Sequence, residues 1–402
     1  MRLKLAGLTF VGLAVSLSIG PIPVDAGFRP SFSLDDCSWN ATHIVVVQTT
    51  AEDGVFSVVE SWKGDLLPRQ SLEIPELKPK AGAVAISEFP QGMKFGFGEA
   101  TGVREQIPKQ PIGSNLILFL KKKPRPELAS QAPETPPATN WEAVPSYGGM
   151  KVSAIWIDEG KGFCFRQLMN PGPSAISECW QHPTEASDSA VLSARIMQVL
   201  QVQQNLAETI AMKSYPEARA HRLGRIALSD IWPARVEALH ALGLSGVVAL
   251  PEILQVMDST VVPNDGDAVM SALVAAAGKN HETLLHARLQ EDLIYWKAIG
   301  PTLTTNWLDQ LMEPGAPLFI KFHETELLIR ELEREHYVPA AKTGAELRDF
   351  WVSQPHLYDP KWGERDLSRG GTALEMLQAE SFGLARQCDD FLKHVSVELP
   401  NH

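Results

Sequence analysis

The residues with the clearest metal-binding chemistry lie in the segment His281-Glu282-Thr283-Leu284-Leu285-His286. A zinc-protease helix carries its two histidines four residues apart, so that both rings face one metal ion. Here the spacing is five residues, about 140° around a helix, so the two rings diverge. Near His323-Glu324, a second histidine, His336, is available only if the fold brings it close. We therefore expect solvated helix surfaces at both places, with no metal and no cofactor.

The run Asn264-Asp265-Gly266-Asp267 resembles part of a calcium-binding loop. Counted from Asp265, position twelve of such a loop is Ala276, which cannot bind a cation. The pattern instead predicts a turn in which Asp267 caps the following helix.

Two common catalytic motifs are absent from the sequence. There is no Gly-x-Ser-x-Gly nucleophile turn and no Gly-rich phosphate loop ending in Gly-Lys-Ser/Thr. An active site assembled from distant residues would leave no such signature. The sequence thus leaves enzymatic activity uncertain and favours a non-catalytic role.

The ten tryptophans are the remaining signal for ligand binding. Large aromatic side chains usually complete a core, and Trp156 alternates with Ala154 and Val152 as a core residue of a strand would. Trp141 lies beside a proline-rich stretch, and it is the residue that we single out for ligand contact.

Composition limits the class of protein before any element is placed. The chain has 402 residues, of which 44% are hydrophobic and 21% charged, enough for two or three domains with their own cores. Its formal net charge of -12 makes nucleic acids and anionic membranes poor partners.

Residues 1–26 have the pattern of a cleavable secretory signal. Arg2 and Lys4 precede an uncharged apolar run from Leu5 to Ile19, and small residues end the segment at Ala26. No later segment has 18 uncharged apolar residues in a row, so we expect no integral membrane segment after the signal is removed. The expected location is outside the cytoplasm, periplasmic or extracellular.

Export would place the four cysteines in an oxidising compartment, where an even number can pair. Three pairings are possible. Cys164 and Cys179 are closest in sequence and flank a turn-rich stretch, so we favour a disulfide between them. That choice leaves Cys37 to pair with Cys388.

Residues 27–185 read as a β module, a small antiparallel barrel or sandwich. The expected strands are short β-branched or alternating runs, at 43–48, 55–62, 71–74, 116–120, 151–157 and 163–167. The run 116–120 is apolar throughout, as in a strand buried on both faces. Residues 122–145 carry six prolines and read as a loop.

Three segments of this module resemble the oligonucleotide/oligosaccharide-binding-like barrels of tissue inhibitors of metalloproteinases and netrin-type modules: Ala41–Val47, Val58–Gly64 and Leu116–Leu120. In that family a cysteine at the mature N-terminus grips the protease zinc. Cys37 would be the eleventh residue after cleavage at Ala26, so the resemblance implies an architecture rather than this activity.

Residues 186–402 change to helical periodicity. One helix ends in small residues at Gly243 and another at Gly278, a period of 35 residues that also places Leu250 over Leu285. A helix ending in small residues and Gly, followed by a second helix that carries leucines, resembles the HEAT-type α-solenoid. Together the two halves predict a β-barrel or sandwich followed by an all-α HEAT-like array.

These features favour an exported, non-catalytic protein that binds or scaffolds a protein or peptide partner. One alternative is an inhibitor or regulator of an extracellular hydrolase, which follows from the barrel resemblance. Another is an enzyme whose site lies at the junction of the two domains.

The signal assignment predicts the N-terminus of the mature protein. N-terminal sequencing of protein purified from the exported fraction should begin at Gly27, because cleavage is expected after Ala26. Recovery of the intact Met1 terminus would contradict the assignment.

Overall fold

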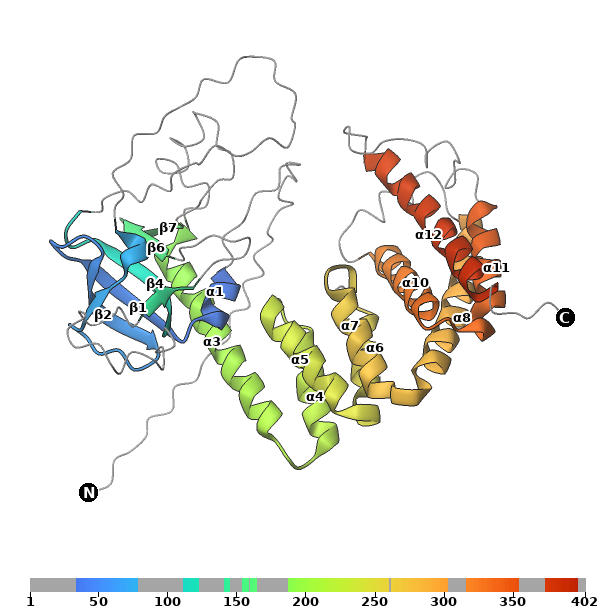
Figure 1. The fold of residues 1–402 in the computed structure, drawn as a ribbon, viewed down its shortest axis with the longest axis horizontal. Coiled ribbons are helices and arrows are strands. Elements are labelled where there is room, and N and C mark those ends of the chain that lie inside the picture. The colour runs from blue at the N-terminus through green and yellow to red at the C-terminus, as the bar shows by residue number, and fades with distance from the viewer. Residues whose placement is uncertain are drawn as a thin grey trace, which may run out of the picture.

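The computed structural model describes nine stretches of the chain: 34–78, 111–122, 141–144, 154–158, 160–164, 187–259, 262–302, 316–353 and 373–396. The first five form most of a curled antiparallel sheet, and the rest are almost entirely helical (Figure 1). This confirms the coarse prediction of a β half followed by a helical half. The signal segment and Cys179 lie outside the described residues.

The sheet has eight strands, with neighbours in the order β3-β2-β1-β4-β6-β7-β8 and with β5 also paired to β4. All of the pairings are antiparallel. The strands are β1 (His43–Thr49), β2 (Val55–Lys63), β3 (Ser71–Glu73), β4 (Asn115–Lys122), β5 (Trp141–Ala143), β6 (Ala154–Asp158), β7 (Lys161–Cys164) and β8 (Ser187–Asp188).

The β1–β2 and β6–β7 hairpins form as predicted, since each joins two β-branched or aromatic runs across a short turn. One expectation for this half was wrong. Trp141–Ala143 is not part of a loop, because it forms β5 and pairs with Leu120–Lys122 of β4.

Strand β4 runs through the centre of the sheet and is buried on both faces. Leu116, Leu118 and Leu120 join one apolar cluster, whereas the alternate residues Ile117 and Phe119 join another on the opposite face. The second cluster is completed by helix α1 (Leu34–Asn40) and by Ile196 of the first long helix. The sheet is therefore covered on that face by helices.

The helical half consists of helices that alternate in direction (Figure 1). Prolines in the first turn begin four of them, at a position where the missing N–H costs nothing. The helices are α3 (Ser189–Ala211), α4 (Pro216–Ala227), α5 (Trp232–Leu244), α6 (Leu250–Met257), α7 (Val262–Ala277), α8 (His281–Ile299), α10 (Pro317–Arg334), α11 (Ala341–Val352) and α12 (Ala373–Ser396).

These helices pack as successive antiparallel pairs, α4 with α5, α6 with α7, α8 with α10 and α11 with α12. One helix of each pair also packs on its counterpart in the next pair, so that α5, α7, α10 and α12 form a continuous row. A single apolar core extends from Leu206 in α3 to Val395 in α12. No helix could bury its apolar stripe alone, and stacking removes these stripes from water.

Gly243 marks a close approach of two helix backbones in this row. A Cβ built on it would lie 3.2 Å from the Cα of Ala272 and 3.2 Å from the Cβ of Ala275, both in α7. The small residues at the end of α5 therefore let its backbone approach that of the next helix.

The sheet and the helices are joined by polar contacts as well as by α3. Arg195 of α3 pairs with Asp35 of α1 at 2.7 Å and with Asp230 beyond α4 at 2.6 Å. Lys63 at the end of β2 donates to the carbonyl oxygens of Ser38 and Trp39 and to Gln203 of α3. Burial lowers the pKa of Lys63 to about 8. These side chains bind one another and brace the junction.

We expect Gly243→Val to lower the free energy of unfolding by about 1–3 kcal/mol, because the added side chain collides with α7. Gly383→Val is the matched control, since Gly383 is also helical but a Cβ added to it would meet no atom within 4 Å. Its effect should stay within about 0.5 kcal/mol. Urea unfolding followed by circular dichroism measures the free energy of unfolding of both variants. Equal losses in the two variants would contradict the close approach of α5 and α7.

Candidate functional site where helices α8 and α10 meet

A buried ionic network sets the alignment of α8 against α10. The Nζ of Lys321 lies 2.8 Å from Asp292 Oδ1 and 2.6 Å from Glu324 Oε2. Both carboxylate side chains are completely buried. Breaking such a pair by removing one partner typically costs about 3–5 kcal/mol, so the two helices are held in one register.

Further polar groups satisfy the same carboxylates. Arg288 Nε donates to Glu324 Oε1 at 2.5 Å, and Arg288 also pairs with Asp258 at the end of α6. Thr325 Oγ1 lies 2.7 Å from Asp292 Oδ2 and accepts a hydrogen bond from the indole Nε1 of Trp296 at 2.9 Å. The network therefore links three helices.

Burial and two neighbouring acids perturb the titration of this network. Burial raises the pKa of Asp292 to about 7, repulsion from Glu324 adds to the rise, and Lys321 and Thr325 oppose it. For Lys321 burial lowers the pKa, but Asp292 and Glu324 together raise it above its ordinary value.

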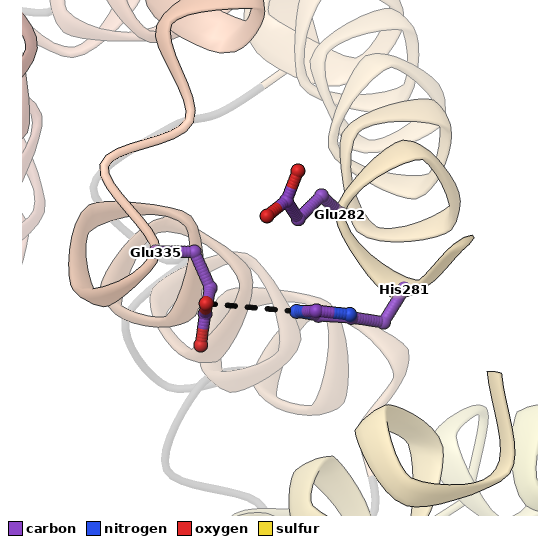
Figure 2. Close-up of side chains that lie close together, drawn as sticks. All are labelled: His281, Glu282 and Glu335. Atoms are coloured by element: carbon purple, nitrogen blue, oxygen red, sulfur yellow. Dashed lines mark ion pairs between the residues drawn. The ribbon is translucent and has the colours of Figure 1, made fainter. Parts of the chain in front are cut away.

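The same register brings together residues at the ends of the two helices. Asp292 lies eleven residues after His281, the first residue of α8, and Glu335 lies eleven residues after Glu324, directly beyond α10. Because α8 and α10 are antiparallel, the alignment of Asp292 with Glu324 also aligns His281 with Glu335. Figure 2 shows the result: the His281 ring points at the Glu335 carboxylate.

His281, Glu282 and Glu335 form a three-residue cluster that could hold a metal ion. Each offers one ligand atom, and these atoms lie within 4.8 Å of one another. His281 Nε2 is 3.7 Å from Glu335 Oε2, and the Glu282 carboxylate projects toward the space beside them (Figure 2). On the other side of the ring, His281 Nδ1 is 2.7 Å from the carbonyl oxygen of Gly278.

The charges around this cluster come from the last turn of α10. Arg334 pairs with Glu331 and lies 3.4 Å from Glu335 Oε1. Burial raises the pKa of Glu331, and nearby Arg334 opposes that rise. One arginine thus faces two carboxylates at the end of α10.

A cavity of about 580 Å³ adjoins the cluster through Glu331 and Arg334. Its charged lining groups already pair with one another: Arg330 with Asp267, and His394 Nδ1 with Glu333 Oε1 at 2.6 Å. A ligand in this cavity would have to displace ion pairs. The described residues that line it are Asp267, Met270, Ser271, Arg330, Glu331, Glu333, Arg334, His336 and His394.

The other histidines considered from the sequence do not join the cluster. His286 points away from it, with Nε2 3.1 Å from Thr343 Oγ1, as its five-residue offset from His281 implies. His323 lies beside Glu326, and His336 faces the His394 ring. The predicted divergence of the two rings is confirmed, but sequence reasoning missed Glu335, which is distant in the chain.

The run 264–267 is not the simple capped turn that we expected. Asp265 sits at a kink inside α7 and is buried, and its carboxylate accepts from Trp232 Nε1 at 2.6 Å and from Arg235 Nε at 2.7 Å. Asp267 pairs with Arg330 across to α10. Both carboxylates therefore serve contacts between helices.

Trp141 packs into the sheet half. It is half-buried against the sheet core, and its ring meets that of His43 edge-on with centroids 4.4 Å apart. His43 Nε2 lies 2.8 Å from Asp65 Oδ1, and a Cβ on Gly64 would collide with the His43 ring. The His43 ring is therefore tightly enclosed. Ligand contact by Trp141 stays a prediction.

The expected pairing of Cys37 with Cys388 is wrong. Cys37 is buried in α1 against the sheet, whereas Cys388 is buried in α12 within the helical core, and the two sulfurs form no disulfide. Helix α1 lies between the sheet and α3, whereas α12 lies at the far end of the helical half (Figure 1). Burial raises the pKa of the Cys388 thiol to about 12. Cys164 ends β7, but its expected partner Cys179 lies outside the described residues, so that bridge is untested.

The Asp292 pKa predicts how stability depends on pH. With a pKa near 7 when folded and about 3.9 when unfolded, Asp292 contributes stability that is fully present below about pH 4 and is lost as the pH rises to about 7. Asn cannot titrate, and its amide can still accept from Lys321 and donate to Thr325. Relative to wild type, Asp292→Asn should therefore gain stability between pH 4 and 7, by at most about 4 kcal/mol.

Urea unfolding of both proteins at several pH values measures this difference. Asp258→Asn, which removes an exposed carboxylate from the same network, controls for the loss of one charge. If the difference in free energy of unfolding between wild type and Asp292→Asn stays constant from pH 4 to 7.5, the raised pKa of Asp292 is contradicted.

Comparison of the chain with protein-family models, with curated proteins and with solved structures found no match. Among the helices that the structure describes, none is both long enough and apolar enough to cross a bilayer.

Proposed function

We propose that the helical half is a HEAT-like solenoid and that the protein is a non-catalytic scaffold that binds another protein outside the cytoplasm. The stacked pairs support the architecture, since α5 and α7 end near Gly243 and Gly278, the positions that define the 35-residue period. The expected signal at 1–26 supports the location.

The observation that carries this proposal is a group of exposed apolar side chains at two turns, which we call the turn surface: Tyr215, Leu244 and Val247. Tyr215 precedes α4 and the other two end α5 and follow it. Tyr215 and Leu244 are each 75% exposed and Val247 is 67% exposed. Large side chains with this exposure gain free energy when a partner covers them, about 1.5–3 kcal/mol for a fully buried Leu or Val.

The turn surface is held in a fixed shape. Arg219, in the first turns of α4, donates to Ser245 Oγ at 3.0 Å and so ties the two turns together. Tyr215 has a left-handed backbone with φ of 61°, which is uncommon for a residue other than glycine. A preorganised surface loses less conformational entropy on binding, and tyrosine is enriched among the residues that dominate interface energies.

The test compares two triple variants of the mature protein. Tyr215→Ser/Leu244→Ser/Val247→Ser removes the turn surface, and Leu228→Ser/Ile294→Ser/Val352→Ser removes exposed apolar side chains elsewhere in the helices. A partner is first captured by the wild type from the exported fraction under mild conditions and identified by mass spectrometry. Its affinity for each purified protein is then measured by calorimetry.

We expect the Kd to rise about 100-fold for the turn-surface variant and less than about 3-fold for the control, because a few central anchors carry most of an interface's energy. Equal affinities for the two variants would contradict the turn surface. Recovery of no partner by the wild type would count against the scaffold role itself.

A further inference from the structure

The hydrogen bond to Gly278 determines which ring nitrogen of His281 carries the proton in the neutral ring. A carbonyl oxygen only accepts hydrogen bonds, so at 2.7 Å the Nδ1 atom of His281 carries the proton. In the neutral ring, Nε2 then presents a lone pair. Such a backbone bond on one ring nitrogen is the usual way in which proteins orient the other nitrogen toward a metal ion.

That lone pair faces another acceptor, and the Nε2 atom itself is shielded from solvent. His281 Nε2 is buried and has no hydrogen-bond partner, and the whole side chain is 16% exposed. The nearest carboxylate atom across from it is Glu335 Oε2 at 3.7 Å. Two lone-pair donors that face each other repel, and a cation between them removes that repulsion. A shared proton fits poorly, because a hydrogen bond spans about 2.7–3.2 Å.

The spacing suits a metal ion better. Two ligands that each lie about 2.1 Å from a tetrahedral zinc ion are about 3.4 Å apart, and a wider angle at the ion accommodates 3.7 Å. Arg334 lies toward Oε1 of Glu335, which leaves Oε2 for the ion. Glu282 can complete the site by a side-chain rotation, since its carboxylate is already within 4.8 Å of the other ligand atoms.

We propose that His281 Nε2, one oxygen of Glu282 and one oxygen of Glu335 bind a divalent transition-metal ion of the zinc type, with water in the remaining position. One imidazole and two carboxylates are a donor set for zinc, whereas calcium and magnesium are bound by oxygen alone. The ion would cross-link the first residue of α8 to the end of α10. This site does not depend on the turn surface or on the proposed scaffold role.

The test uses the full mature protein and two probes, Zn²⁺ and Co²⁺. We expect one metal site that depends on His281. Binding of Zn²⁺ should raise the thermal midpoint of unfolding. Bound Co²⁺ should give the visible absorption of a low-coordinate N/O site, and added Zn²⁺ should abolish that absorption by displacing Co²⁺. In His281→Gln the Zn²⁺ affinity of this site should fall about 100-fold or more. In Glu335→Gln it should fall as well, because that variant removes a second ligand.

His221→Gln is the matched control. His221 also pairs with a glutamate on the helices, with its Nδ1 3.2 Å from Glu252 Oε1, but this pair belongs to no three-residue cluster among the described residues. Its Zn²⁺ affinity should match wild type. If His281→Gln fails to fold, Glu282→Gln replaces it as the test variant.

Three results would overturn the proposal. They are Zn²⁺ binding that His281→Gln and Glu335→Gln leave unchanged, no effect of Zn²⁺ or Co²⁺ on the folded wild type, and a His281-dependent response to pH with no response to metal. The last would mean that a proton alone joins the two side chains.

Discussion

The alignment of α8 with α10 depends on Lys321 held between two buried carboxylates, Asp292 and Glu324. A slide of one helical turn would leave at least one of these charges buried without its partner, a large loss for a protein of ordinary stability. Hydrophobic packing alone tolerates many registers, because it is non-directional. The polar network therefore selects the register, and the meeting of His281 with Glu335 follows from it.

The two halves are joined by more than a linker. Helix α3 contributes Ile196 to the sheet core and Leu206 to the helical core, so one rigid helix belongs to both. Arg195 of α3 adds an ion pair with Asp35 of α1, and Lys63 of β2 adds a hydrogen bond to Gln203 of α3. An enzyme site at this junction gains no support from the described side chains, since the polar groups there bind each other.

The two proposals place binding at turns rather than on helix faces. The faces of α5, α7 and α10 are used for stacking, whereas the residues of both proposals lie at helix ends and turns. Turn residues are also released from helical periodicity, which lets Tyr215 take a left-handed backbone and lets His281 reach back to Gly278. A stacked array can thus keep its core unchanged while the chemistry at its turns varies.

Local patterns in the sequence determined the hairpins, the doubly buried strand β4, the helix boundaries near Gly243 and Gly278, and the divergence of His281 from His286, because each depends on residues close together in the chain. Only the tertiary structure decided which residues distant in the chain contact these elements. Trp141 became a strand residue by pairing with β4, Asp265 became a buried acceptor for Trp232, and Cys37 and Cys388 fell into separate cores. Glu335 met His281 because a register fixed eleven residues away brought them together. Such partners depend on how whole elements align, and no local pattern encodes that alignment.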